Sequence, residues 1–236
     1  MKFLSPTWLA AALLFTVGCS APDFMSPSSR NTAPATPDSS ETSAPTPVAV
    51  TQAPTLDLTV IPGERVGEID ARTSRAELAE LYGEENLTDE EVHVGEGLFE
   101  PGTTLDMGEG RSLSIIWSDE TRTQPLEVRD LGYAWKLPEG IGVGTTFEEL
   151  KTVLGTFELT GFGWDYGGTV FLEGTPLAEY DSLVWIRLNP ADGAIAGNSE
   201  AFEAVMGDRM ISSEDPNLTA LDLQVDEIGI YLNPVE

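Results

Sequence analysis

Two short segments of this chain carry the same pattern: residues 73–83 read TSRAELAELYG and residues 145–155 read TTFEELKTVLG. Aligned without gaps, both begin with two hydroxyl residues, have Glu-Leu in the middle and end on glycine. A hydroxyl residue followed three positions later by Glu forms the capping box that begins a helix, and a glycine after the last turn is typical of its end. The pattern predicts two short helices of the same design.

Apolar residues recur at helical spacing in both segments, which predicts one buried face on each helix. The residues expected on these faces are Leu78, Leu81 and Tyr82 in the first helix, and Phe147, Leu150 and Leu154 in the second. A third and weaker echo of the pattern is SEAFEAVMG at residues 199–207.

The segments between and after these helices show the alternation of apolar and polar residues that favours β-strands. The alternating runs are residues 113–117, 133–137, 184–188, 221–225 and 228–232. Helices and strands therefore come in blocks, which is typical of an α+β fold with antiparallel sheet. We expect an α+β domain of two similar halves, each a short capped helix packed on antiparallel strands, with the repeat spanning about 60–137 and 138–236.

The first part of the chain has the features of an export signal and a linker. Met1-Lys2 precedes the apolar run WLAAALLFTV, which is too short to span a bilayer but suits a signal peptide over residues 1–18. Residues 19–55 are rich in Ser, Thr and Pro, so we expect a flexible tether there. Residues 56–236 then form a single acidic globular domain.

Cys19 is the single cysteine of the chain, so no intrachain disulfide is possible. The sequence Thr16-Val17-Gly18-Cys19 resembles the bacterial lipobox, with Thr16 in place of the usual leucine. The resemblance implies that the Cys19 thiol carries a diacylglycerol and anchors a secreted protein to the cell envelope. In a Gram-negative cell it implies the outer membrane, facing the periplasm or the cell surface. A plain secreted protein with a free thiol is the alternative.

The composition is strongly acidic, with 40 Asp and Glu residues against 12 Lys and Arg residues and a net charge of −28. Such a charge repels nucleic acid, so we expect no nucleic-acid partner. It suits a solvated surface, and it also suits a cationic partner or a salty habitat.

The repeated helix, closed by Leu-x-x-Leu/Val-x-Gly and followed by strands, resembles the small repeats of the β-lactamase-inhibitor-protein and BamE-like families. Those families are secreted or lipid-anchored binding modules, so the resemblance implies a binding role. It covers the helical motif of each half and carries over no functional residue. The stretch GFGWDYGGTV at residues 161–170 also resembles parts of uncharacterised bacterial lipoproteins.

This aromatic–glycine stretch is the most distinctive local feature of the sequence. In an extended chain, Phe162, Trp164 and Tyr166 share one face, with Asp165 and the glycines on the other. One interpretation is an aromatic surface for a sugar or a protein partner. The interpretation that we favour is a core strand whose glycines let a neighbouring element approach closely.

Motifs for catalysis, metals and cofactors are missing from the sequence. The chain has one histidine, His93, which is too few for a typical zinc site, and its many carboxylates single out no catalytic pair. No calcium-binding loop, phosphate-binding loop or GxSxG motif is present. We therefore expect no catalytic residue, no metal and no cofactor.

The sequence favours a non-enzymatic binding or structural role towards another envelope protein. Two alternatives stay open. The first is a carbohydrate-binding or hydrolytic envelope protein that uses the aromatic segment 162–166. The second is a proteinaceous inhibitor of an envelope hydrolase.

Overall fold

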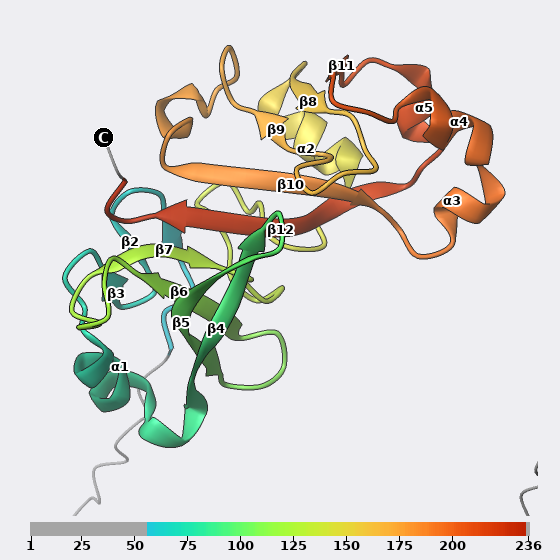
Figure 1. Ribbon diagram of the computed structural model, residues 1–236. Helices are drawn as coiled ribbons and strands as arrows, with labels where there is room; N and C mark the ends of the chain where they lie inside the picture. The colour runs from blue at the N-terminus through green and yellow to red at the C-terminus, as the bar shows by residue number, and fades with distance from the viewer. Residues whose placement is uncertain (1–55, 235–236) are drawn as a thin grey trace, which may run out of the picture. The chain divides into compact units, whose positions relative to one another are not determined.

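The computed structural model describes residues 56–234, so the predicted signal peptide, Cys19 and the predicted tether lie outside the described residues. Its largest element is a six-stranded, fully antiparallel sheet with the order β10-β12-β7-β6-β5-β4 (Figure 1). The strands are β4 (Leu87–Gly95), β5 (Leu98–Asp106), β6 (Ser112–Trp117), β7 (Pro125–Arg129), β10 (Val184–Pro190) and β12 (Leu223–Tyr231).

Two three-stranded sheets and several short helices complete the described part of the chain. One sheet joins β1 (Val60–Ile61), β2 (Arg65–Val66) and β3 (Ile69–Asp70), and the other has the order β11 (Met210–Ser212), β8 (Glu158–Thr160), β9 (Val170–Phe171). The helices are α1 (Arg75–Tyr82), α2 (Phe147–Leu154), α3 (Ala194–Gly197), α4 (Ser199–Ala204) and α5 (Pro216–Thr219), with 3-10 turns η1 (Glu84–Asn86) and η2 (Ala178–Tyr180). The predicted α+β class with antiparallel sheet is confirmed.

Both predicted capping boxes are formed. In α2, the Thr146 backbone N–H donates to the Glu149 carboxylate at 2.9 Å, and the Glu149 N–H donates to the Thr146 hydroxyl at 3.3 Å. Ser74 and Glu77 make the same reciprocal pair at the start of α1. Each pair satisfies two backbone N–H groups that have no partner inside the helix, which explains why both helices begin at these residues.

The predicted buried faces are confirmed for α2 and only partly for α1. Phe147, Leu150 and Leu154 are all buried. In α1, Leu78 and Tyr82 are buried four residues apart, but the Leu81 side chain is 44% exposed, so its assignment to the core was wrong. In α1, the stripe that faces the core is filled by the i, i+4 pair of Leu78 and Tyr82, and Leu81 lies at its rim.

The late strand β12 joins the two predicted halves of the chain. It pairs with β7 at Ile230↔Val128 and with β10 at Ile186↔Ile228, so one sheet contains strands from both sides of residue 138. The structure therefore does not show two similar halves, although both capped helices exist.

A β-bulge in β12 explains the broken alternation near the end of the chain. Val225 is opposite Leu188 and Glu227 is opposite Arg187, so Asp226 is an extra residue in β12. The bulge shifts the alternation by one residue, which keeps both Val225 and Ile228 buried. The two runs predicted at 221–225 and 228–232 thus contribute to a single strand.

The strand predicted at residues 133–137 was wrong. Trp135 and Leu137 are buried, but the Tyr133 side chain is 60% exposed and the segment turns instead of extending. The Trp135 backbone N–H donates to the Gly132 carbonyl at 3.2 Å, which closes a tight turn. Gly132 packs directly on the Gly110 backbone, where a Cβ atom would overlap. The runs at 113–117 and 184–188 are confirmed as parts of β6 and β10.

The two faces of the six-stranded sheet have different character because side chains alternate along each strand. One face joins a contiguous core with the helices and the small sheets, and its central residues include Leu113, Val128 and Ile186. The opposite face, here called the open face, carries polar and aromatic side chains from β7, β10 and β12. Trp185 on β10 lies on this face, between the buried Val184 and Ile186.

The capping box of α2 gives the first prediction. Replacing Thr146 with Ala removes the acceptor for the Glu149 N–H, so we expect a loss of about 1 kcal/mol in the free energy of unfolding, measured by urea denaturation. Thr152→Ala in the same helix is the matched control, since its hydroxyl bonds only to the Glu148 carbonyl at 2.9 Å. The control variant should keep or gain stability. Equal losses in the two variants would contradict the capping role.

Candidate functional site

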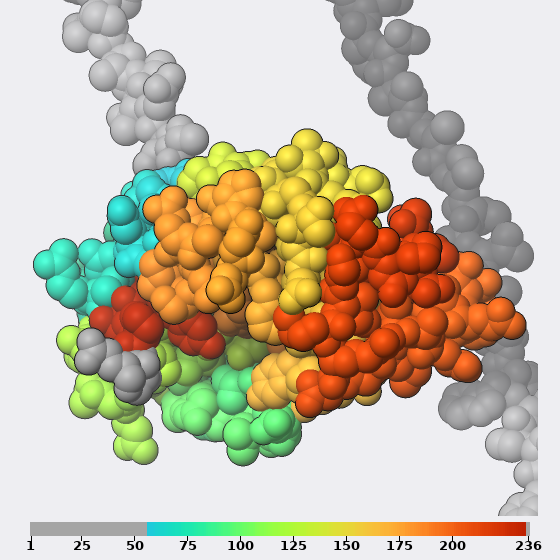
Figure 2. All heavy atoms as spheres, turned by 90° about the horizontal axis from the view of Figure 1, so that it is seen from above, coloured from blue at the N-terminus to red at the C-terminus, as the bar shows by residue number. Residues whose placement is uncertain are grey.

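A pocket of about 530 Å³ lies on the open face of the six-stranded sheet. Residues from β6, β7, β10 and β12 form its floor and sides, and the β4–β5 hairpin and the turn at residues 165–169 border it. In Figure 2 the green hairpin and the orange β9–β10 segment lie on opposite sides of this hollow. The lining residues on which its chemistry depends are Trp117, Glu127, Arg129, Tyr166, Trp185 and Tyr231.

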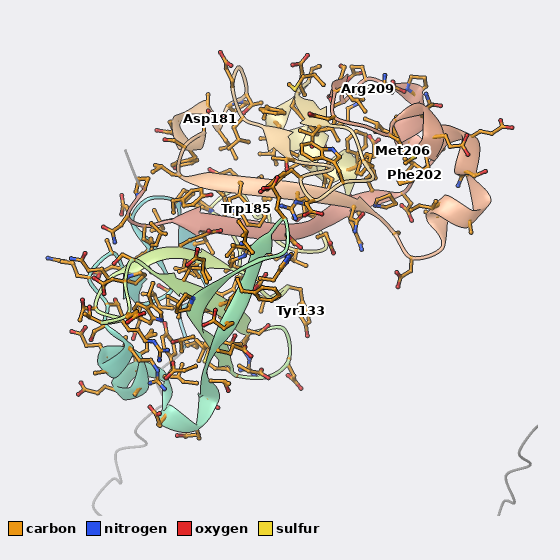
Figure 3. The ribbon with its side chains drawn as sticks, viewed as in Figure 1. Tyr133, Asp181, Trp185, Phe202, Met206 and Arg209 are labelled. Atoms are coloured by element: carbon orange, nitrogen blue, oxygen red, sulfur yellow. The ribbon has the colours of Figure 1, made fainter. Side chains whose placement is uncertain are left out.

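Trp185 is the central side chain of the pocket, and Gly229 determines where its indole lies. The two residues are directly opposite each other in the β10–β12 ladder. A Cβ atom on Gly229 would overlap the indole at Cε2 and Nε1. A strand interior is an unfavourable place for glycine, and here the missing side chain lets the indole lie across the β12 backbone. Figure 3 shows Trp185 between the β10–β12 pair and the β4–β5 hairpin.

Glu127 fixes the orientation of this indole. The Trp185 Nε1–H donates to Glu127 Oε1 at 2.9 Å, across the intervening strand β12. The Glu127 side chain is buried, and its desolvation raises the pKa of the carboxyl group. The positive charge of Arg129 and the hydrogen bond from Trp185 oppose this shift by stabilising the carboxylate.

Two arginines lie against the same indole. The guanidinium carbons of Arg129 and Arg187 are 5.3 Å and 5.1 Å from the Trp185 ring centroid, within the range of a cation–π interaction. Arg187 Nη1 also donates to Glu227 Oε2 at 2.8 Å. The Nε atom of each arginine is buried and has no hydrogen-bond partner among residues 56–234. The pocket therefore holds desolvated N–H donors that the described residues do not satisfy.

Further aromatic and acidic groups complete the pocket wall. The Trp117 indole N–H is bonded to Thr103 Oγ1 at 2.9 Å, which fixes that ring. Tyr231 is half-buried, and desolvation together with the nearby Glu127 raises the pKa of its phenol. Glu100 and Asp181 supply exposed carboxylates at the rim, and Figure 3 shows Asp181 beside the beginning of β10.

The tip of the β4–β5 hairpin is attached to the turn that borders the pocket. The Glu96 backbone N–H donates to the Asp165 carboxylate at 2.6 Å. Gly95 approaches the Tyr166 phenol, where a Cβ atom would lie 3.3 Å from the Tyr166 oxygen. This contact closes one side of the pocket and places Tyr166 in its wall.

The strand predicted for the aromatic stretch was wrong, because residues 163–168 form turns. Gly163 and Gly168 have φ angles of 88° and 79°, which an extended strand does not allow. The three aromatic side chains consequently do not share a face. The expected close approach of a glycine to a neighbouring strand is confirmed, because Gly168 packs on the Leu188 carbonyl so tightly that a Cβ atom would overlap it.

The residues of this stretch have different environments. Phe162 is buried in the core, as we favoured, whereas the Trp164 side chain is 38% exposed. Trp164 and Tyr166 contact each other edge to face at 5.4 Å between ring centroids. Tyr166 lines the pocket around Trp185, while Trp164 and Asp165 border a separate, smaller recess. The predicted surface is therefore divided, and one of its members belongs to the candidate site.

Glu127, Arg129, Trp185 and Arg187 were not predicted as site residues from the sequence. A signal existed, because a tryptophan at the polar position of an alternating strand is unusual. The partners come from strands far apart in the chain, so only the sheet order brings them together.

Neither a cluster of metal-binding side chains nor a helix that could span a membrane is present among residues 56–234. No group of three or more His, Cys, Asp or Glu side chains there is arranged to hold a metal ion. No helix in this part of the chain is long and apolar enough to cross a membrane. His93 is exposed on β4, with its ring centroid 5.2 Å from that of Phe99.

No family model matches the chain, and no curated protein matches it. Among solved structures, the chain is similar to the uncharacterized protein yfeY from Escherichia coli, with 15% sequence identity and a TM-score of 0.42. That similarity covers 74% of this chain and 99% of yfeY.

The contact between Trp185 and Gly229 gives the second prediction. In Gly229→Ala the new methyl group displaces the indole and breaks its bond to Glu127, so the near-ultraviolet circular dichroism should change. We expect the free energy of unfolding to fall by about 1–3 kcal/mol. Gly197→Ala is the matched control, because no atom lies within 4 Å of the added methyl group. An unchanged tryptophan signal in Gly229→Ala would show that the indole does not lie on β12.

Proposed function

We propose that this domain is a non-enzymatic binding module of the bacterial cell envelope, and that the pocket around Trp185 binds a carbohydrate. The observation that carries the proposal is the set of charged groups fixed around one indole, namely Arg129, Arg187 and Glu127. Such a site combines an apolar surface with both hydrogen-bond donors and hydrogen-bond acceptors.

The chemistry of a sugar matches this combination. Each sugar ring has apolar C–H faces that stack on aromatic side chains, and hydroxyl groups that both donate and accept hydrogen bonds. Guanidinium groups only donate and carboxylates only accept, so the two kinds together can bind vicinal hydroxyls. Trp185, Tyr166 and Tyr231 supply the aromatic surface. The volume of the pocket is in the range typical of small-ligand sites.

The cellular location in this proposal comes from the sequence. A lipid on Cys19 would hold the protein at the membrane, and the Ser/Thr/Pro-rich residues 19–55 would give the domain reach into the envelope. Envelope glycans are then within reach of the pocket.

A hydrolytic function is a second candidate, favoured by Glu127. A buried carboxyl group with a raised pKa beside aromatic rings resembles the general acid of a glycosidase. That reaction needs a second carboxylate across the cleft, and Glu100 and Asp181 are the other carboxylates of the pocket. We prefer binding without cleavage, because Glu127 Oε1 already accepts the Trp185 indole N–H at 2.9 Å and so serves to orient that ring.

A protein partner remains the other candidate, and the β4–β5 hairpin supports it. Leu98 and Phe99 are adjacent at the start of β5, and their side chains are 59% and 57% exposed. Exposed neighbouring apolar groups of this size are typical of contact surfaces between proteins. An envelope adaptor or an inhibitor of an envelope hydrolase would use this surface.

The third prediction separates these candidates with purified protein and envelope glycan fragments. We expect the immobilised wild-type protein to retain glycan and Trp185→Ala to bind at least about tenfold more weakly, since stacking and orientation are lost together. Trp164→Ala is the matched control and should bind normally, because Trp164 lies outside the pocket.

Each other result selects a different function. Loss of binding in Trp164→Ala but not in Trp185→Ala would move the site to the aromatic turn. Shortened glycan products would favour the hydrolase. Capture of an envelope protein, with no glycan and with dependence on Leu98 and Phe99, would replace the carbohydrate proposal with a protein partner.

A further inference from the structure

We infer that the ligand of the pocket carries a carboxylate group, and that Arg129 receives it. The identity of the rest of the ligand as a sugar rests on the proposed function, but the carboxylate is inferred from Arg129 itself. The combined expectation is an acidic sugar, with its carboxylate directed to the floor of the pocket.

Arg129 is a buried cation with too few partners. Its side chain is 8% exposed, and its Nε atom has no hydrogen-bond acceptor among residues 56–234. Asp130 is the one carboxylate of the described residues within ion-pair distance, at 3.7 Å from Nε. That distance is too long for a hydrogen bond. An arginine stays charged at all ordinary pH values, so its burial is unfavourable until an acceptor binds.

Another half-buried arginine of this domain shows what a satisfied guanidinium looks like. The Arg75 side chain is 16% exposed, and it donates to Glu84 with both Nη atoms and to Asp89 with Nε. Arg129 is more deeply buried, and the part of the chain that the structure describes offers it no such pair of carboxylates. The chain therefore supplies carboxylates to Arg75 but supplies no such pair of acceptors, among the described residues, to Arg129, which lines the pocket.

The nearest carboxylate in the pocket does not fill this role. Glu127 influences Arg129 through its charge, but one of its oxygens accepts the Trp185 indole N–H, and no ion pair joins Glu127 to Arg129. Moving Glu127 onto Arg129 would break the bond that orients the indole. A ligand that brings its own carboxylate satisfies Arg129 and leaves Trp185 in position.

A carboxylate fits this site better than a more highly charged anion. Its planar pair of oxygens matches the fork of the guanidinium, which gives two parallel hydrogen bonds. The exposed carboxylates of Glu100 and Asp181 at the rim, and the net charge of −28, oppose anions with several charges. The same rim carboxylates accept hydrogen bonds from hydroxyl groups at the other end of the ligand.

The fourth prediction compares three small probes that differ at one position: methyl β-glucuronide, the corresponding glucuronamide and methyl β-glucoside. Binding to the wild-type protein is followed by the shift of the Trp185 indole N–H in nuclear magnetic resonance spectra. We expect the acid to bind about tenfold more tightly than the amide or the glucoside, because only the acid offers a charge-assisted pair to Arg129.

The variants test whether Arg129 causes this preference. Arg129→Gln should bind the acid and the amide equally, and Arg129→Lys should keep only part of the preference, because a lysine lacks the planar fork. Arg72→Gln is the matched control for the loss of one positive charge, since its side chain is 87% exposed and lies outside the pocket. If Arg129→Gln does not fold, the probe series on the wild-type protein and on Arg129→Lys still tests whether Arg129 binds the carboxylate of the ligand.

The outcomes distinguish this inference from the proposed function. Equal binding of the three probes would overturn the carboxylate and leave the carbohydrate site intact. Binding of an N-acetyl dipeptide through its free carboxyl end, with no sugar bound, would support the carboxylate and overturn the carbohydrate. An acid preference that survives in Arg129→Gln, or no binding of any probe at millimolar concentration, would overturn the inference.

Discussion

The pairing of β12 with β7 on one side and β10 on the other is the constraint on which the rest of the structure depends. It joins β12, the last strand of the described residues, to strands from much earlier in the chain. The result is a single sheet of six strands. The bulge at Asp226 lets β12 present apolar side chains to the core on both of its sides. It also fixes the register that sets Trp185 opposite Gly229, so the pocket exists only because this pairing is made.

The electrostatics of the pocket differ from those of the surface around it. The protein is strongly acidic, yet two of its 12 basic residues lie against one indole on the open face. Glu127 accepts the indole N–H and Glu227 accepts from Arg187, whereas Arg129 Nε has no acceptor among residues 56–234. A buried guanidinium N–H without an acceptor destabilises the folded domain. A ligand that supplies the acceptor removes this cost, so the same group affects both folding stability and ligand binding.

Local patterns could be predicted from the sequence, and long-range assembly could not. The capping boxes at Ser74 and Thr146 are determined within four residues, so they were found correctly. The aromatic stretch was misjudged because glycines permit both a strand and the turns that Gly163 and Gly168 make. The candidate site was missed because Glu127 and Trp185 are 58 positions apart and meet only across β12. The residues that flank Glu127 and Trp185 in the sequence do not indicate that the two side chains meet.

The most direct test of a binding pocket at Trp185 uses the indole N–H signals of the tryptophans as reporters in a glycan titration. The four described indoles have different acceptors: Trp117 bonds to Thr103, Trp135 to Ser112, Trp164 to Gly161 and Trp185 to Glu127. Our account predicts that the signals of Trp185 and Trp117 shift with a common dissociation constant, while those of the buried Trp135 and of Trp164 stay in place. A shift confined to Trp164, or no shift in the Trp185 signal while glycan binds, would contradict it.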